Sequence, residues 1–329
     1  MRVYILTEGG KDIGFGHIVR CSAIYDAFLE VGIEPLFVVN GDESVLDLLN
    51  SRDYVLFDWI KERQKVFDII QYADIGVIDS YLAPFNFYER FEKSVKLPLY
   101  IDDNKRFEYP RGIVVNGSIY AKEMKYPMKK GLRYLLGPEY VLLRKEFWDI
   151  PERNVRRDVE KLLITFGGDD MRGLTPRVLT LLDKRFPNIL KMVVVGKGFK
   201  NREEIANYKG NKVSLVWYPD GEKMKELMMD ADIAVSAGGQ TLYELARIGV
   251  PPIVVGVAKN QKNNIEGWKK KGFIQYAGWW DKEEVIENVA SFVESLMPYE
   301  VRKEIGELGR EIVDGKGPKR VVDTLLSTS

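Results

Sequence analysis

Short apolar runs alternate with amphipathic stretches along almost the whole of this 329-residue chain, and this rhythm limits the possible folds more than any other feature. The apolar runs are continuous stretches of valine, isoleucine and leucine, which is typical of strands covered on both faces. The amphipathic stretches between them have the helical period, as at residues 17–31 and 240–248. This order predicts an α/β fold with parallel sheets and helices on both faces. We expect strands at residues 3–7, 35–39, 54–57, 75–79, 99–102, 161–166, 191–195, 213–217, 233–236 and 252–255.

The rhythm breaks once, around residues 147–158, where the chain is polar, charged and contains Pro151. This segment is the best candidate for a linker between domains. We therefore expect two doubly wound, Rossmann-like domains at residues 1–150 and 151–329. Sheets of this kind bind ligands beyond the carboxyl ends of their strands, so we expect the two domains to face a cleft.

The composition narrows the chemistry further. Lysine and arginine together number 49, as do aspartate and glutamate, so the formal net charge is zero and a broadly basic nucleic-acid binder is excluded. The single cysteine, Cys21, excludes an intramolecular disulfide and a cysteine-cluster zinc site. The single histidine, His17, excludes multi-histidine metal sites. We expect neither a metal ion nor a cofactor.

The sequence shows neither a membrane span nor a signal peptide. The longest apolar run lies near residues 250–258 and contains two prolines, well short of the roughly 18 residues that a span needs. The first residues predict a strand rather than the apolar segment of a signal peptide. We expect a cytoplasmic enzyme, and a monomer rather than an oligomer.

Residues 13–20 form a glycine-rich segment after the first expected strand. Gly14 and Gly16 would let the chain turn tightly and approach a ligand, and the following helix would present free N–H groups. A dinucleotide site is not expected, because the third glycine of that motif is missing and the second strand ends at Val39-Asn40, with no acid there to hold a ribose. We interpret His17 as a general base, since the helix end favours a neutral imidazole; a buried or capping histidine is the alternative. Arg20 lies three residues on and could contact a ligand or form a surface ion pair.

A second glycine pair, Gly238 and Gly239, lies between an apolar strand and an amphipathic helix that starts with Gln240 and Thr241. Free amides at such a helix start suit an anion, and in particular a diphosphate. Glu244, one turn further on, could accept hydrogen bonds from both hydroxyls of a ribose. An ordinary first-turn acid, favoured by the helix dipole, would look the same in the sequence.

Gly167 and Gly168 end the first expected strand of the second half, where glycines admit a phosphate or a base. The acid pairs at residues 102–103 and 169–170 could suggest a metal site. Adjacent acids are more typical of turns and helix caps, and no third ligand is evident.

Three motifs occur in one order that is similar to a known family. They are Gly14-Phe15-Gly16-His17-Ile18-x-Arg20, then Phe166-Gly167-Gly168-Asp169, then Ser236-Ala237-Gly238-Gly239-Gln240-Thr241-x-Tyr243-Glu244 with Ala258-Lys259-Asn260-Gln261. Over roughly residues 1–280 the chain resembles the UDP-sugar hydrolases of pseudaminic acid biosynthesis. Those enzymes are grouped with spore-coat polysaccharide proteins and are related to the GT-B transferase of peptidoglycan lipid II synthesis.

The resemblance implies a GT-B fold in which the second half holds UDP and the last helix is able to pack back on the N-terminal domain. In the family, the histidine matching His17 activates water, and residues matching Tyr81 and Asn260 line the sugar site. The residues expected to bind the sugar are Gly14, Gly16, Arg20, Tyr81, Asn260 and Gln261; those expected to bind UDP are Gly167, Gly168, Tyr218, Pro219, Gly238, Gly239, Gln240, Thr241 and Glu244. Ser80 departs from the pattern, because well-known members have histidine there, so the sugar is not specified.

The resemblance therefore predicts metal-independent hydrolysis of a UDP-linked amino-sugar at C1, in nonulosonic acid or surface polysaccharide biosynthesis. A GT-B glycosyltransferase with a carbohydrate or lipid acceptor would use the same residues and is the main alternative. A nucleotide-sugar binding module without turnover is the second alternative. A nicotinamide oxidoreductase is disfavoured by the missing glycine and the missing ribose acid.

Overall fold

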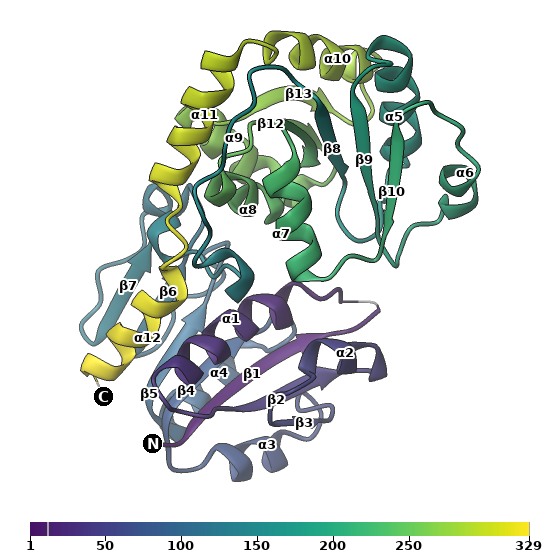
Figure 1. Cartoon of the computed structure of the whole chain (residues 1–329). Helices are drawn as coiled ribbons and strands as arrows, with labels where there is room; N and C mark the ends of the chain where they lie inside the picture. The colour runs from purple at the N-terminus through teal and green to yellow at the C-terminus, as the bar shows by residue number, and fades with distance from the viewer. Residues whose placement is uncertain (12, 329) are drawn as a thin grey trace. The chain divides into compact units, whose positions relative to one another are not determined.

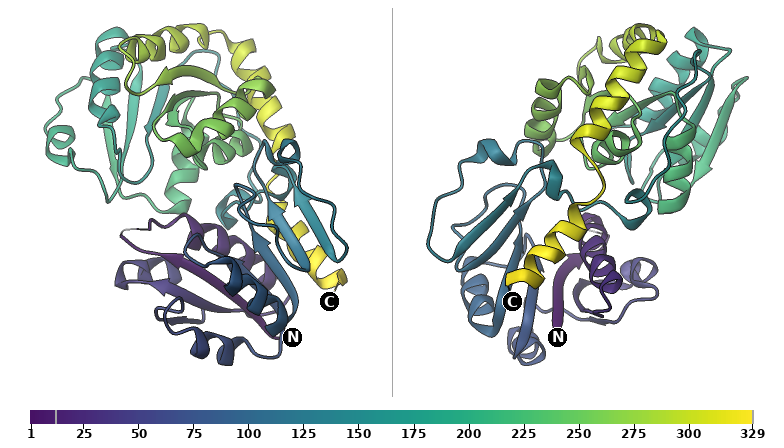
Figure 2. Two further views of the ribbon diagram at one scale, coloured as in Figure 1. Left: turned by 180° about the vertical axis from the view of Figure 1, so that it is seen from behind. Right: turned by 60° about the vertical axis from the view of Figure 1, so that its left-hand side comes forward.

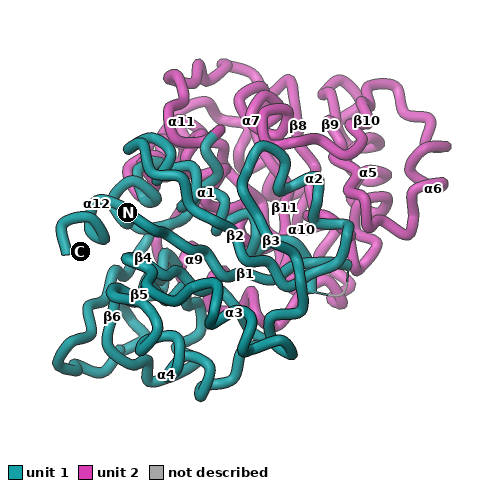
Figure 3. Tube along the Cα trace, turned by 90° about the horizontal axis from the view of Figure 1, so that it is seen from below, with its two compact units in different colours: residues 1–145, 315–329 teal, residues 146–314 magenta. Residues whose placement is uncertain are grey.

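The computed structural model describes residues 1–11 and 13–328. The chain forms two compact units, one of residues 1–145 with 315–329 and one of residues 146–314 (Figure 3). We call them unit 1 and unit 2. Within the described residues, no helix has the length and apolar character that crossing a membrane requires.

Unit 1 is built on a seven-stranded sheet with the order β3-β2-β1-β4-β5-β6-β7 (Figure 1). Every neighbouring pair is parallel. The order reverses between β1 and β4, which is the switch point where such sheets bind ligands. The strands are β1 (Val3–Gly9), β2 (Leu36–Gly41), β3 (Tyr54–Leu56), β4 (Ala73–Asp79), β5 (Val95–Ile101), β6 (Gly112–Asn116) and β7 (Leu132–Leu136).

Helices cover this sheet on both faces. They are α1 (Gly16–Glu30), α2 (Leu46–Leu49), α3 (Arg63–Ile70), α4 (Phe85–Ser94) and α12 (Gly317–Thr328). Helix α12, the yellow helix that ends at the C label in Figure 2, comes from the end of the chain and packs against α1. Lys319 Nζ lies 2.9 Å from Glu30 of α1, and Arg320 donates a hydrogen bond of 3.0 Å to the Glu139 carbonyl.

Unit 2 is built on a six-stranded sheet with the order β10-β9-β8-β11-β12-β13. All of its strand pairs are parallel, and the order reverses between β8 and β11. The strands are β8 (Lys161–Thr165), β9 (Leu190–Val195), β10 (Val213–Trp217), β11 (Ile233–Ala237), β12 (Pro252–Gly256) and β13 (Gln275–Trp279). The helices are α5 (Leu174–Arg185), α6 (Arg202–Ala206), α7 (Gly221–Asp230), α8 (Thr241–Ile248), α9 (Lys262–Lys271), α10 (Val285–Ser295) and α11 (Tyr299–Ile312).

The two doubly wound parallel sheets confirm the predicted fold class. All ten expected strands are present, and β6, β7 and β13 are additional. The cores consist of aliphatic side chains on the central strands and of an aromatic cluster in unit 1 that includes Trp59, Phe87, Tyr88 and Phe91.

Candidate active site and nucleotide site

The loop between β1 and α1 carries the first group of expected site residues. Gly10 and Gly14 close this loop by exchanging backbone hydrogen bonds of 3.1 and 2.8 Å. Gly14 has φ +86°, a left-handed conformation that favours glycine. The helix begins at Gly16, so His17 lies in its first turn, beside the carboxyl ends of β1 and β4.

His17 forms a pair with a buried carboxylate at the end of β4. Its Nδ1 lies 2.7 Å from Asp79 Oδ1, and the histidine is 9% exposed. Burial raises the pKa of Asp79, but the charges and hydrogen bonds of Arg20 and His17 outweigh this effect and hold the pKa well below its usual range. An ionised carboxylate only accepts hydrogen bonds, so Nδ1 carries a proton and Nε2 is the nitrogen that has the lone pair in the neutral imidazole. This is the tautomer that a general base requires.

Arg20 binds two carboxylates at once. Its Nε and Nη2 donate to the two oxygens of Asp79, the latter at 2.6 Å, and its Nη1 donates to Asp103 at 2.6 Å. Nη2 also lies 3.0 Å from His17 Nδ1, but these two nitrogens do not hydrogen-bond to each other, because both donate to Asp79. The side chain predicted to contact the sugar thus holds the partners of the histidine and of Tyr81 in place.

Tyr81 lies against the histidine ring. The two rings meet edge to face at 4.7 Å and 87°. The Tyr81 hydroxyl donates to Asp103 at 2.7 Å, and its backbone N–H donates to Glu8 at 2.6 Å. The residue is 45% exposed, so it remains available to a ligand. Ser80 is buried and donates to Glu8, so it holds the loop rather than lining the site.

In unit 2, Gly167 and Gly168 follow β8, next to the switch point. Gly167 has φ +82°, and a Cβ at either position would meet no atom within 4 Å, so the backbone lies open to a ligand.

Within the described residues, the two acid pairs do not form a metal site. Asp170 accepts hydrogen bonds of 2.9 Å from the amides of Leu174 and Thr175 and caps α5. Asp102, from the acid pair in unit 1, accepts a hydrogen bond of 2.6 Å from the Tyr126 hydroxyl. Across residues 1–11 and 13–328, no group of three or more His, Cys, Asp or Glu is placed to hold a metal ion.

The turn from β11 to α8 contains Gly238, Gly239, Gln240 and Thr241. The Gly238 amide donates to Gln261 Oε1 at 3.3 Å. The next three amides donate to no protein acceptor within the described residues, so three donors stay free at the start of α8. Glu244 follows in the first turn and is 6% exposed.

The remaining expected residues lie on neighbouring loops of the same unit. Gln261 bridges two loops, because its Oε1 also accepts from the Val257 amide at 3.1 Å. Asn260 is exposed in the short turn before α9. Tyr218 and Pro219 follow β10 at the far side of the sheet, where Tyr218 has φ +51° and accepts a hydrogen bond of 3.0 Å from Arg202.

Sequence reasoning missed three residues that organise these loops. Asp79 and Asp103 hold His17, Arg20 and Tyr81, and Asn264 holds the Gly238–Gly239 turn. Asp79 ends an expected strand just before Tyr81, which was a usable signal. Nothing local in the sequence distinguishes Asn264 from its neighbour Asn263.

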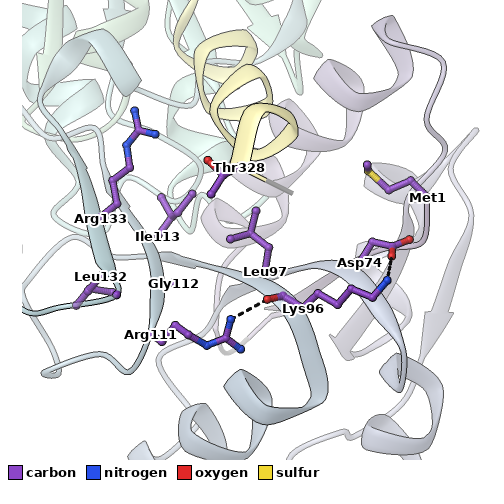
Figure 4. A pocket seen from close by; sticks show the side chains of 11 residues that line it. Met1, Asp74, Lys96, Leu97, Arg111, Gly112, Ile113, Leu132, Arg133 and Thr328 are labelled. Atoms are coloured by element: carbon purple, nitrogen blue, oxygen red, sulfur yellow. Dashed lines mark hydrogen bonds and ion pairs between the residues drawn. The ribbon is translucent and has the colours of Figure 1, made fainter.

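A cavity of about 630 Å³ lies at the other end of the strands of unit 1, where β4 to β7 begin. Figure 4 shows its two central cations already engaged: Lys96 pairs with Asp74 at 2.8 Å, and Arg111 donates to the Lys96 carbonyl at 2.9 Å. The switch-point loops, rather than this cavity, hold the acid–base groups and the free amides.

Known proteins resemble this chain in sequence and in fold. Residues 163–304 match the glycosyltransferase family 28 C-terminal domain. The chain is 24% identical over 344 residues to the spore coat polysaccharide biosynthesis protein SpsG of Bacillus subtilis, covering 99% of this chain and 98% of that protein. It is 25% identical over 265 residues to a Helicobacter pylori protein named pseudaminic acid cytidylyltransferase and UDP-2,4-diacetamido-2,4,6-trideoxy-beta-L-altropyranose hydrolase, covering 79% of this chain.

A third relative, MJ1062 of Methanocaldococcus jannaschii, is 25% identical over 82% of this chain. The match spans only 59% of MJ1062 and 45% of the Helicobacter protein.

Solved structures show the same fold. MurG of Acinetobacter baumannii has a TM-score of 0.68 at 13% identity, with 99% of each chain covered. UGT89C1 of Arabidopsis thaliana, solved in complex with UDP, has a TM-score of 0.72 at 11% identity, with 98% of this chain and 99% of that chain covered. The chain therefore has the GT-B fold, its second half matches the glycosyltransferase family 28 C-terminal domain, and its sequence is similar to SpsG and to the Helicobacter pseudaminic acid protein.

Proposed function

We propose that this protein is an enzyme that cleaves a UDP-linked amino-sugar at C1 with water and releases UDP and the free sugar. The observation that carries the proposal is the His17–Asp79 pair, 2.7 Å apart, at the switch point of unit 1. A histidine oriented by a buried carboxylate is the arrangement by which proteins hold an imidazole ready to take a proton.

In the proposed reaction, Nε2 of His17 takes a proton from water as the water oxygen forms a bond to C1. The bond between C1 and the diphosphate oxygen breaks, and its electron pair leaves with UDP. Attack from the face opposite the leaving group inverts C1. General-base assistance of this kind is typically worth about 10²–10⁴-fold in rate.

The proposed binding site for UDP is in unit 2. The free amides of Gly239, Gln240 and Thr241 would stabilise the charge that grows on the departing diphosphate. Glu244 would accept hydrogen bonds from the ribose, and the loop of Tyr218 and Pro219 would contact the uracil. Variants in either unit should then affect one and the same reaction.

The names of the relatives support this assignment. One is named in part as the hydrolase of a UDP-linked diacetamido-trideoxy sugar, and another is named for spore coat polysaccharide biosynthesis. We place the reaction in the biosynthesis of nonulosonic acids or of surface polysaccharides.

A glycosyltransferase is the second candidate, and the match to the glycosyltransferase family 28 C-terminal domain favours it. Such an enzyme would use the same histidine to deprotonate an acceptor hydroxyl instead of water. The two functions differ in one observable: a transferase releases UDP quickly only when its acceptor is present.

A panel of UDP-amino-sugars followed by proton and phosphorus NMR tests the proposal. We expect UDP and the free sugar to appear without any acceptor, with the opposite anomeric configuration at first. UDP release that depends on an added carbohydrate or lipid acceptor would favour the transferase. Tight UDP binding with no turnover across the panel would indicate a binding module.

A further inference from the structure

We propose that Asn264, locked by Tyr243, is the positioning residue that aims the free amides of the Gly238–Thr241 turn at the diphosphate. The inference rests on the proposed UDP site and concerns Asn264, which sequence analysis did not single out. Asn264 lies in α9 and is 9% exposed, so it acts from beneath the turn.

The amide group of Asn264 bridges the turn and a neighbouring helix. Its Nδ2 donates to the Gly238 carbonyl at 2.9 Å and to the Gly239 carbonyl at 3.3 Å. Its Oδ1 accepts a hydrogen bond of 2.6 Å from the Tyr243 hydroxyl. Because carbonyl oxygens only accept, the two carbonyls of the turn require the amide nitrogen to face them, and the tyrosine hydroxyl donates to the amide oxygen on the other side.

Peptide geometry turns this contact into a directional effect. The C=O and N–H of a trans peptide point in opposite directions. Pulling the Gly238 carbonyl inward therefore points the Gly239 amide outward, and pulling the Gly239 carbonyl inward does the same for the Gln240 amide. One buried side chain thus sets the direction of two of the three free donors.

The packing around the Gly238–Thr241 turn restricts it to this conformation. A Cβ on Gly238 would collide with Ile265, the residue that follows Asn264 in α9. The Tyr243 ring lies edge to face on Trp268 at 5.1 Å and 67°, which fixes its hydroxyl. Gln261 accepts a hydrogen bond from the Gly238 amide, so this amide faces the protein, whereas the amides of Gly239 and Gln240 face outward.

The experiment compares the affinities of UDP and uridine for the full chain and its variants. Uridine lacks the diphosphate, so only the UDP affinity depends on the aimed amides. We expect Asn264→Ala to weaken UDP binding by about 10- to 100-fold, the effect of losing oriented hydrogen bonds to a charged group, while uridine binding stays within about 2-fold. Asn263→Ala, the same change at the exposed neighbour in α9, should alter neither affinity.

A second variant guards against a folding defect. Tyr243→Phe keeps the ring on Trp268 and removes only the hydroxyl, and should weaken UDP binding by about 2- to 10-fold with uridine unchanged. Equal losses for UDP and uridine, or an unchanged UDP affinity in both variants, would overturn the positioning role. A wild-type protein that binds UDP no more tightly than uridine would refute the diphosphate site itself, and the inference with it.

Discussion

At the residue scale, the candidate site is built from side chains that act through one another. His17 could be singled out from the sequence because it is the only histidine and follows a glycine loop. Its partner Asp79 lies 62 positions away, and Arg20 reaches both Asp79 and Asp103. Contacts between residues so far apart depend on strand order, and a local pattern does not contain that information.

The first prediction concerns the orientation of the base. Asp79→Asn replaces a carboxylate, which only accepts hydrogen bonds, by an amide, which can also donate them. His17 thereby loses the partner that fixes its tautomer. By analogy with the same change in a Ser-His-Asp triad, we expect turnover of the substrate found in the NMR panel to fall by about 10²–10⁴-fold. UDP affinity should stay unchanged, since UDP is assigned to unit 2. Turnover within a few-fold of wild type would contradict the role of Asp79.

The second prediction concerns acid stability. The pKa of Asp79 is raised by burial but lowered further by Arg20 and His17, so in the folded state it lies below the ordinary value of 3.8. A carboxyl group of this kind contributes stability that is present above about pH 4 and is lost as the pH falls further. The stability difference between wild type and Asp79→Asn should therefore be largest near neutral pH and shrink below about pH 4.

Urea unfolding at a series of pH values measures this difference. Asp68→Asn, a change at an exposed acid on α3, serves as the control and should show little difference at any pH. A difference for Asp79→Asn that grows as the pH falls would contradict the account.

At the element scale, most central strands were predictable, whereas two of the four edge strands, β7 and β13, were not. Strands β1 and β4 are buried on both faces, so their continuous apolar runs are visible in the sequence. Strands β7 and β13 lie at sheet edges and are mostly half-buried, so their sequences lack such a run. Strand β6 is buried, but its apolar run of Ile113, Val114 and Val115 is short.

The turn between β11 and α8 offers a matched pair of glycine substitutions. Gly238→Ala places a methyl group on Ile265, whereas the nearest atom to a Cβ at Gly239 is Gln261 Nε2 at 3.9 Å. We expect Gly238→Ala to destabilise the protein by about 1–3 kcal/mol through overpacking. Gly239→Ala should leave the stability unchanged and weaken UDP binding, because the methyl group lies beside a free amide. Thermal unfolding and UDP titration check both, and the reverse pattern would contradict the assigned turn geometry.

At the scale of the whole molecule, the end of the chain belongs to the unit in which it starts. The break at residues 315–318 was visible in the sequence, and residue 315 is where the chain returns to unit 1. The partner of the last helix could not be derived from the residues, because an apolar stripe does not say which surface it covers. In the structure, α12 packs on α1, the helix that carries His17.

This packing predicts a separation between stability and nucleotide binding. Leu325 is fully buried in α12, so Leu325→Ala should cost about 2–5 kcal/mol of stability. UDP affinity should stay unchanged at temperatures where the variant is folded, because the expected UDP residues lie in unit 2. Ser327→Ala, at an exposed position of the same helix, should change neither. A loss of less than about 1 kcal/mol for Leu325→Ala would contradict the packing of α12.

The most direct test of the central claim is the single-turnover rate of His17→Asn with the UDP-sugar that wild type cleaves, measured together with its UDP affinity. The account predicts a rate lowered by about 10²–10⁴-fold and an unchanged UDP affinity, because the imidazole takes a proton and does not hold the nucleotide. A variant that releases UDP and sugar at the wild-type rate would contradict it.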